Sequence, residues 1–345
     1  MIGAKPKVKI TRRDVAQRAG VSEATVSFVM SGKRFVSDDL KERVMKAIDE
    51  LGYYPDMIAR AMIEKKSNSI AVLTNDLENP LQMKIIKSIE ESAMSKGYFV
   101  NICGGTMKLD RYVNNLISRH IDGVFLAGDP YAITGSHMNQ LLESNISVAL
   151  GTVSEDMDPR MCGVAIDFKE GMRLIIDYLS KLGHKRIAYL SAFDKNSIGD
   201  VRLPSFYRCM KEYFGDESPL VKMGKPPYDS TVTEGYHLTL SLLEDTKDFT
   251  CLICTNDMMA FGAISALQQE GIRVPADVSV VGIDDILFSK DFYPALTTLS
   301  HQTEEFGAKV VEILCDNILD KSVVRREIIL PKLIVRDSTA PPHSL

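Results

Sequence analysis

Polar side chains that could bind a small ligand follow the carboxyl ends of several predicted strands. They are Asp76, Asn79, Asp167, Asn256, Asp257 and Asp284, and Arg202 stands in a loop of the same region. Carboxylates and amides gathered at one edge of a sheet suit a ligand with several hydroxyls, because each group can hold one specific donor. The alternative is that each strand-end Asp or Asn only caps the helix that follows it. A single such residue favours the cap, whereas the whole set with Arg202 favours a binding site.

The chain lacks the spacings that catalysis or metal binding would need. It contains no G-x-x-x-x-G-K-[ST], G-x-G-x-x-G or G-x-S-x-G motif, and its six His residues show no metal-ligand spacing. Cys251 and Cys254 have the spacing of a redox pair, but residues three apart in a strand point to opposite faces. We therefore expect no catalytic residues, no metal and no cofactor.

The larger part of the chain alternates short apolar runs with amphipathic patterns. Strands are predicted at 70–73, 99–103, 124–126, 148–150, 163–166, 186–190, 252–254 and 278–283, and helices at 82–96, 111–120, 170–182, 236–243 and 259–270. This alternation is typical of doubly wound parallel sheets, here two of them. In such sheets a ligand binds beyond the carboxyl ends of the strands, where the polar residues stand.

Residues 11–52 instead predict three short helices. Thr11 and Asp14 have the spacing of a capping box, and Gly20 ends the first helix. Ser22 is placed to cap a second helix at 23–30, and Ser37 a third at 38–51. Two helices joined by a tight turn of small residues form a helix-turn-helix unit.

Charge and composition support a small basic head on a larger acidic body. Residues 1–66 hold 14 Lys and Arg against 9 Asp and Glu, whereas the rest holds 27 Lys and Arg against 37 Asp and Glu.

A hydrophobic content of 45% provides for a sizeable core, and no apolar run approaches the ~20 residues that span a bilayer. The first ten residues lack the features of a secretory signal, and six scattered cysteines favour a reducing compartment. We expect a cytoplasmic protein whose head binds nucleic acid.

In a helix-turn-helix unit the second helix enters the major groove, and its first residues meet base edges. The positions expected to be exposed on that helix are Glu23, Ala24, Thr25, Ser27 and Phe28. Hydroxyl groups suited to phosphate oxygens stand at Ser22, Thr25 and Ser27. The positive charge that attracts the phosphates comes from Arg12, Arg13, Lys33 and Arg34. A generic three-helix packing unit is the alternative.

Several motifs together resemble the LacI family of bacterial repressors. In the head they are residues 14–22 (DVAQRAGVS), 25–27 (TVS) and 52–55 (GYYP). In the body they are residues 183–188 (GHKRIA), 202–203 (RL), 256–262 (NDMMAFG), 275–285 (PADVSVVGIDD) and 294–298 (PALTT). The resemblance thus extends from about residue 11 to residue 337.

The resemblance implies a fold and a set of contacts. Residues 56–62 stand where the family has a hinge helix, and Met62 matches the apolar residue that wedges a base step in the minor groove. The DNA-contacting residues that the resemblance implies also include Thr11, Tyr53, Ile58 and Ala59. The implied core has two periplasmic-binding-protein-like subdomains with an effector in the cleft between them. Arg202, Asn256 and Asp284 match its effector-contacting residues.

Other positions depart from the family pattern. Leu81 and Ser230 replace residues that are often aromatic, and the chain has no Trp, although Tyr228 or Phe193 could supply a ring. Glu23, Ala24 and Phe28 replace the Arg, His, Gln or Tyr that commonly read bases, so we expect a different operator. Ser31 replaces an Asn after the recognition helix. The effector expected is a sugar or sugar phosphate.

The expected fold is an all-α helix-turn-helix headpiece followed by an α/β core of two doubly wound parallel-sheet subdomains. The headpiece covers 9–55, the hinge and linker 56–67, and the core 68–340, with subdomains at 68–165 plus 297–328 and at 166–296 plus 329–340. The predicted function is a repressor that binds a palindromic operator as a homodimer under effector control, in the cytoplasm and associated with the nucleoid. Two alternatives remain: an α/β enzyme with an accessory DNA-binding head, and a regulator whose body binds a partner protein.

Overall fold

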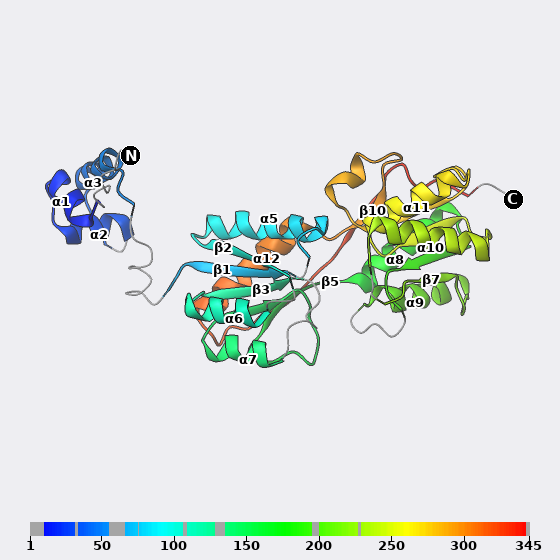
Figure 1. Cartoon of the computed structure of the whole chain (residues 1–345), viewed down its shortest axis with the longest axis horizontal. Coiled ribbons are helices and arrows are strands. Elements are labelled where there is room, and N and C mark those ends of the chain that lie inside the picture. Colours follow the sequence, from blue (N-terminus) through cyan, green and yellow to red (C-terminus); the bar gives the residue numbers. More distant parts are fainter. Residues whose placement is uncertain are drawn as a thin grey trace, which may run out of the picture. The chain divides into compact units, whose positions relative to one another are not determined.

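The structure is a computed structural model of the whole chain and describes residues 10–31, 34–54, 66–74, 76–105, 109–127, 135–194, 200–226 and 229–342. The chain divides into two compact units, residues 1–67 (unit 1) and 68–345 (unit 2), coloured along the sequence in Figure 1. Within the described residues, no helix is both long enough and apolar enough to cross a membrane. The predicted hinge at 56–67 lies almost wholly outside the described residues.

Unit 1 contains the three predicted helices, α1 (Arg12–Ala19), α2 (Glu23–Ser31) and α3 (Asp38–Leu51). Thr11 and Asp14 form the predicted capping box, and Gly20 ends α1 at φ 66°, in the left-handed region that favours glycine. The Ser22 hydroxyl accepts a hydrogen bond from the Thr25 amide at 3.1 Å, as predicted for the cap of α2. The apolar faces meet in one small core around Val15, Val26 and Val44.

The prediction for Ser37 is wrong. Ser37 does precede α3, but its side chain makes no capping hydrogen bond. The third helix is instead fixed to the first by Arg43, whose guanidinium donates to the Ala19 carbonyl oxygen at 2.6 Å. Arg43 thereby satisfies a carbonyl at the carboxyl end of α1, where a cation is favoured.

Unit 2 contains two six-stranded sheets. The first has the order β11-β5-β4-β3-β1-β2, and all of its strands are parallel. These strands are β1 (Ser69–Thr74), β2 (Phe99–Gly104), β3 (Gly123–Ala127), β4 (Ser147–Leu150), β5 (Cys162–Ile166) and β11 (Arg326–Ile329). The buried residues of β1 alternate between the two faces of this sheet, so both faces need a cover of helices.

The second sheet has the order β12-β10-β9-β8-β6-β7. Its strands are β6 (Ile187–Ser191), β7 (Val221–Met223), β8 (Cys251–Cys254), β9 (Ser279–Asp284), β10 (Thr297–Ser300) and β12 (Lys332–Ile334). All are parallel except β12, which runs antiparallel to β10 at the edge. Cys251 and Cys254 are free, fully buried residues of β8, which agrees with their interpretation as strand residues.

Helices cover both faces of each sheet (Figure 1). On the first sheet, α5 (Pro80–Ser95) and α12 (Thr303–Leu319) pack on one face, and α6 (Leu109–Ser118) and α7 (Gly135–Glu143) on the other. On the second, α10 (Val232–Asp245) and α11 (Asp257–Gln269) pack on one face, and α8 (Phe168–Leu182) and α9 (Arg202–Phe214) on the other. A short 3-10 helix, η3 (Leu287–Lys290), follows β9.

The chain passes between the two sheets three times, and this corrects three predicted boundaries. It crosses after β5, after β10 and between β11 and β12. The prediction places residues 297–300 in the first subdomain, but they form β10, which pairs with β9 of the second sheet. It places Ile166 and Ile329 in the second subdomain, but these residues pair with each other in β5 and β11 of the first sheet. These short strands show no clear periodicity, because three or four residues are too few to define one.

Candidate DNA-binding and effector-binding sites

In unit 1, two arginines lie against residues that were predicted to read bases. Arg12 Nε is 3.5 Å from Glu23 Oε2, and both side chains are half exposed. The guanidinium carbon of Arg34 lies 4.9 Å from the centre of the Phe28 ring. A cation–π contact at an exposed site contributes about 0.5–1 kcal/mol. The positive charge is therefore placed next to the predicted base-reading positions of α2.

The other predicted DNA contacts of unit 1 differ in exposure. Arg13 and Ala24 are exposed, Ser27 is half-buried, and Tyr53 packs against the core of unit 1. Lys33, Ile58, Ala59 and Met62 lie outside the described residues, as does the side chain of Ser31.

In unit 2, three of the predicted effector-binding residues cap helices. The side-chain oxygens of Asn79, Asp167 and Asn256 accept from amides at the starts of α5, α8 and α11, at 2.9–3.0 Å. The capping alternative is thus correct for these oxygens. Asn256 has a second contact, since its Nδ2 donates to the Ser230 carbonyl oxygen at 2.9 Å. Asp76 is exposed and accepts from the Glu78 amide within its own loop.

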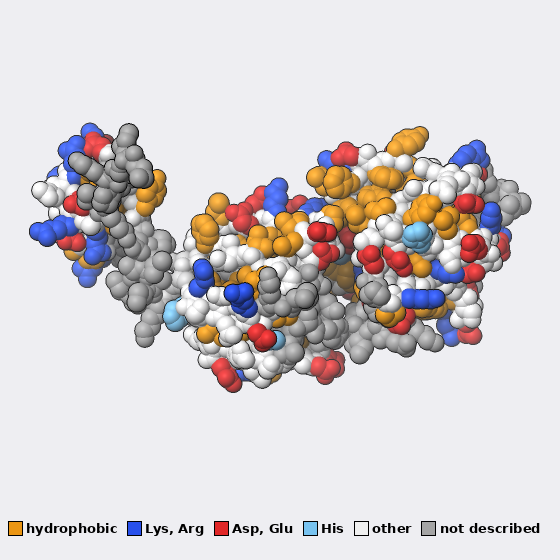
Figure 2. Space-filling view, in the orientation of Figure 1, with side chains coloured by type: hydrophobic (Ala, Val, Ile, Leu, Met, Phe, Trp, Pro, Cys, Tyr) orange, Lys and Arg blue, Asp and Glu red, His pale blue; other side chains and the backbone are white. Residues whose placement is uncertain are grey.

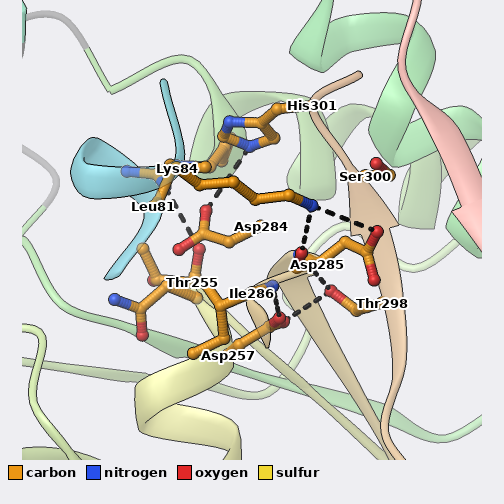
Figure 3. Close-up of polar contacts among 12 residues, drawn as sticks. Leu81, Lys84, Thr255, Asp257, Asp284, Asp285, Ile286, Thr298, Ser300 and His301 are labelled. Atoms are coloured by element: carbon orange, nitrogen blue, oxygen red, sulfur yellow. Dashed lines mark hydrogen bonds and ion pairs between the residues drawn. The ribbon is translucent and has the colours of Figure 1, made fainter. Parts of the chain in front are cut away.

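Asp257 must be removed from the predicted effector contacts. It is fully buried, and both carboxylate oxygens are used within the protein. Oδ1 accepts from the Thr298 hydroxyl at 2.5 Å, and Oδ2 accepts from the Ile286 amide at 3.0 Å (Figure 3). Oδ2 also accepts from the Ser289 hydroxyl at 2.5 Å. Asp257 therefore holds the ends of β9 and β10 together and is not available to a ligand.

A buried cluster forms where the chain passes between the sheets. Arg202 lies over the Phe168 ring, with its guanidinium carbon 5.4 Å from the ring centre, and His301 meets the same ring edge-on at 5.1 Å. His301 Nε2 is 3.4 Å from Asp284 Oδ1 (Figure 3). Arg202 also donates to Asp200 Oδ1 at 2.8 Å and to the Thr255 carbonyl oxygen at 3.1 Å. The cluster thus joins α8, α9, β9 and the residue after β10.

Burial governs the protonation of this cluster. It raises the pKa of Asp284 well above its usual range, with help from Asp257 and against Arg202. It lowers the pKa of His301 to about 3, and the positive charges of Arg202 and Lys84 act in the same direction. Burial alone would lower the pKa of Arg202, but Asp200, Tyr189 and Asp284 outweigh it and raise that pKa. Burial therefore disfavours the charged forms of Asp284 and His301, whereas Arg202 keeps its charge and pairs with Asp200 at 2.8 Å.

Two buried polar atoms of the cluster have no hydrogen-bond partner among the described residues. They are Nε2 of His301 and Oδ2 of Asp200. Buried polar atoms without partners cost free energy, so such atoms in a native structure point to a ligand or a water that completes them. Oδ2 of Asp200 can accept a hydrogen bond, and Nε2 of His301 can accept or donate one according to its tautomer, so both atoms suit a ligand with hydroxyl groups.

The structure also revises the expectation about aromatic residues. Leu81 packs against the core of the second sheet, and Ser230 contributes its carbonyl to Asn256. Phe193 packs on the same core, and Tyr228 lies outside the described residues. The ring that does lie between Arg202 and His301 is Phe168, which follows Asp167 directly. An aromatic side chain is thus present in the cluster despite the absence of Trp.

Four residues in or beside this cluster are absent from the sequence prediction: Phe168, His301, Asp200 and Lys84. His301 follows β10, so the rule of examining the residue after each strand would have identified it had that strand been recognised. Phe168 stands next to a residue that was predicted. Nothing in the sequence around Lys84 indicates its contact with Asp285, because the two residues are distant in the chain. In the described parts of the chain, no group of three His, Cys, Asp or Glu side chains is placed to hold a metal ion.

The buried His301 predicts a specific pH dependence of stability. In the unfolded chain its pKa is near 6.5, so below that pH the folded state binds fewer protons and loses stability. Between pH 7 and pH 5 this residue alone should lower the free energy of unfolding by about 2 kcal/mol. Asp284 has the opposite effect, because its raised pKa favours the folded state as the pH falls.

Changing His301 alone separates the two effects. Between pH 7 and pH 5, the free energy of unfolding of His301→Gln should fall by about 2 kcal/mol less than that of the parent protein. Urea denaturation at the two pH values measures this difference. His237→Gln, at an exposed histidine of α10, is the control and should follow the parent profile. A His301→Gln profile parallel to that of the parent would mean that His301 binds a proton as readily in the folded protein as in the unfolded chain, contrary to its lowered pKa.

Comparison with known proteins identifies the family. Residues 11–56 match the family described as bacterial regulatory proteins, lacI family, and residues 176–339 match a periplasmic binding protein-like domain. The HTH-type transcriptional repressor PurR of Proteus mirabilis is 32% identical over 340 residues, covering 96% of this chain and 97% of that protein. PurR of Pasteurella multocida is 31% identical, covering 95% of this chain and 98% of its own.

Solved structures of regulators are also similar to this chain. The lac repressor dimer bound to operator and the anti-inducer ONPF has a TM-score of 0.80 at 27% identity, covering 96% of this chain and 100% of that one. The complex of the transcriptional regulator CelR with cellobiose has a TM-score of 0.69 at 27% identity, covering 95% of this chain and 99% of that one. The matches extend across the headpiece and both sheets. This chain belongs to the lacI family of bacterial regulatory proteins.

Proposed function

We propose that this protein is a DNA-binding transcriptional repressor that acts as a homodimer on a palindromic operator under the control of a small effector. The observation on which this rests is the combination of two sites in one chain. Unit 1 places Arg12 beside Glu23 at the start of α2 and Arg34 over Phe28 further along that helix, and unit 2 encloses an incomplete polar cluster between its sheets. The relatives named above are repressors or regulators, and none is named as an enzyme. A DNA-binding role places the protein in the cytoplasm with the nucleoid.

The headpiece reads the operator through α2. Glu23 can accept from cytosine N4, and Ala24 and Phe28 can contact a thymine methyl group in the major groove. Ser22, Thr25, Ser27 and the arginines position the helix on the phosphates. The hinge residues Ile58, Ala59 and Met62, with Tyr53, are proposed to enter the adjacent minor groove, where Met62 separates a base step.

The effector binds at the junction of the two sheets, against Arg202, Phe168, His301 and Asp284. Because Asp200 pairs with Arg202 and burial disfavours charge on Asp284 and His301, the site favours a ligand without net charge that carries several hydrogen-bonding groups. The Phe168 ring can pack on an apolar face of such a ligand. A sugar fits this chemistry better than a sugar phosphate. We include Asn256 and Ser230 in the proposed site, together with Asp76, Asn79, Leu81 and Asp167, which follow strands β1 and β5 of the first sheet.

An apolar surface supports the homodimer. Figure 2 shows hydrophobic side chains gathered over α10, α11 and η3. A pocket of 440 Å³ in this surface is lined by Pro80, Val232, Met258, Phe261, Ser265, Phe288 and Phe292. Leu287 and Phe288 are more than half exposed beside it. Exposed apolar groups of this extent commonly mark an interaction site, and a two-fold dimer matches a two-fold operator.

Effector binding would control operator binding by a shift between two arrangements of the sheets. The chain crosses between them three times, so a change in their angle moves the segment that leads to the headpiece. A ligand that prefers one arrangement shifts the equilibrium by the difference of its two affinities, in such systems about 1–3 kcal/mol.

The first prediction concerns base reading. Operator selection from random duplexes with the full-length protein should enrich a palindrome, and Phe28→Ala should relax the preference at one position of each half-site. Arg13→Ala, the control, should weaken binding to all sequences and reduce the salt dependence, because Arg13 is proposed to contact phosphate. Failure of the parent protein to enrich any palindrome would contradict the proposed function.

The second prediction concerns the dimer. Phe288→Glu places a charge in the apolar surface and should convert the dimer to a monomer in analytical ultracentrifugation, with operator affinity lowered at least tenfold. Leu319→Glu, at an exposed leucine of α12, should leave the dimer intact. A dimeric Phe288→Glu protein would place the interface elsewhere.

The third prediction concerns the effector. In a thermal-shift screen of neutral sugars, sugar phosphates and nucleosides, we expect stabilisation by a neutral sugar, because a ligand that binds only the folded state raises Tm. Arg202→Ala should abolish this shift while operator binding survives. Stabilisation by sugar phosphates alone would overturn the neutral-ligand assignment, and an empty screen would favour a partner protein in place of a metabolite.

A further inference from the structure

One lysine connects the two sheets beside the effector site. Lys84 belongs to α5, which covers the first sheet, but its Nζ donates to the backbone carbonyl oxygen of Asp285 at 2.9 Å (Figure 3). The same Nζ lies 3.8 Å from Asp285 Oδ2. Both side chains are largely buried, with 31% of Lys84 and 17% of Asp285 exposed. A hydrogen bond from a charged donor in such a position is stronger than a neutral one at the surface.

Asp285 is itself held firmly on the side of the second sheet. Its Oδ1 accepts from Arg336 Nη2 at 2.6 Å, and its amide donates to the Thr298 hydroxyl at 3.3 Å. The next residue, Ile286, is bound through its amide to the buried Asp257. Lys84 therefore attaches α5 to a rigid part of the second sheet and not to a free loop.

The backbone connects this attachment to the effector residue. Asp284 has φ 132° and Asp285 has φ 55°, so two consecutive non-glycine residues adopt conformations that cost energy. Such a turn has few alternative conformations, and a displacement of Asp285 must also displace Asp284. Leu81, one turn before Lys84 on α5, packs against the core of the second sheet. The same face of α5 thus makes an apolar and a charged contact across the junction.

We infer that Lys84 is a positioning residue that holds the two sheets together beside Asp284. Its role in regulation rests on the proposed function, because it concerns the same effector site. Lys84 stabilises one of the two arrangements between which the effector shifts the protein. It does so through Asp285 and without touching the ligand.

Hydrogen–deuterium exchange of the full-length protein, with neither DNA nor ligand present, tests this inference. We expect Lys84→Met to accelerate exchange about fivefold or more in two peptides, one covering 77–86 and one covering 284–292, because removing the contact raises the population in which the junction is open. Exchange in the central strands β3 and β8 should not change. Lys84→Arg, which keeps a charged donor, should restore most of the protection.

The control variant lies on the same helix. Lys87 is three-quarters exposed, and among the described residues its ion pair is with Glu91 on α5 itself, so Lys87→Met should exchange like the parent protein. If Lys84→Met exchanges like Lys87→Met, or if it accelerates exchange equally throughout unit 2, the positioning role is wrong. The experiment uses no operator and no effector, so this failure is distinct from failure of operator selection, which would overturn the proposed function instead.

Discussion

The buried carboxylate of Asp257 is the interaction on which the effector site depends. It joins the start of α11 to Thr298 of β10, to Ser289 and to the amide of Ile286. Gly282 of β9 makes room for it, because a Cβ there would lie 2.2 Å from Asp257 Oδ1. With these ends fixed, Asp284 and Asp285 are held in a turn of positive φ, one facing the buried cluster and the other Lys84 and Arg336. A residue whose carboxylate is used entirely within the protein therefore determines where the residues of the proposed effector site lie.

Burial then determines the chemistry of that site. A buried charge is costly unless it is paired, so Arg202 is accompanied by Asp200, while burial shifts the pKa values of Asp284 and His301 towards their neutral forms. The result is a site rich in hydrogen-bonding capacity and poor in net charge. This argues for recognition by shape and by individual donors, in contrast to the phosphate recognition that dominates the headpiece. The two sites thus use opposite physical principles within one chain.

The headpiece and the core also differ in how they are stabilised. Unit 1 has a small core, and its helices are tied together by caps and by the Arg43 contact to α1. Unit 2 buries both faces of two sheets. The two sheets are linked by three chain crossings and by the Lys84 contact, so few interactions determine their relative position. A ligand can therefore change that position without unfolding either sheet.

The sequence by itself determined the features that depend on neighbouring residues. The capping box of Thr11 and Asp14, the end of α1 at Gly20 and most long strands follow from local spacing, and so does the family. Arg202 and Asp284 were predicted, and the structure places them in one cluster. Only the tertiary structure could separate Asp284 from Asp257, since both are strand-end carboxylates and only packing decides which one is consumed internally. His301, Phe168 and Lys84 were likewise found only there, because their contacts join residues distant in the chain, and local patterns contain no information on such pairings.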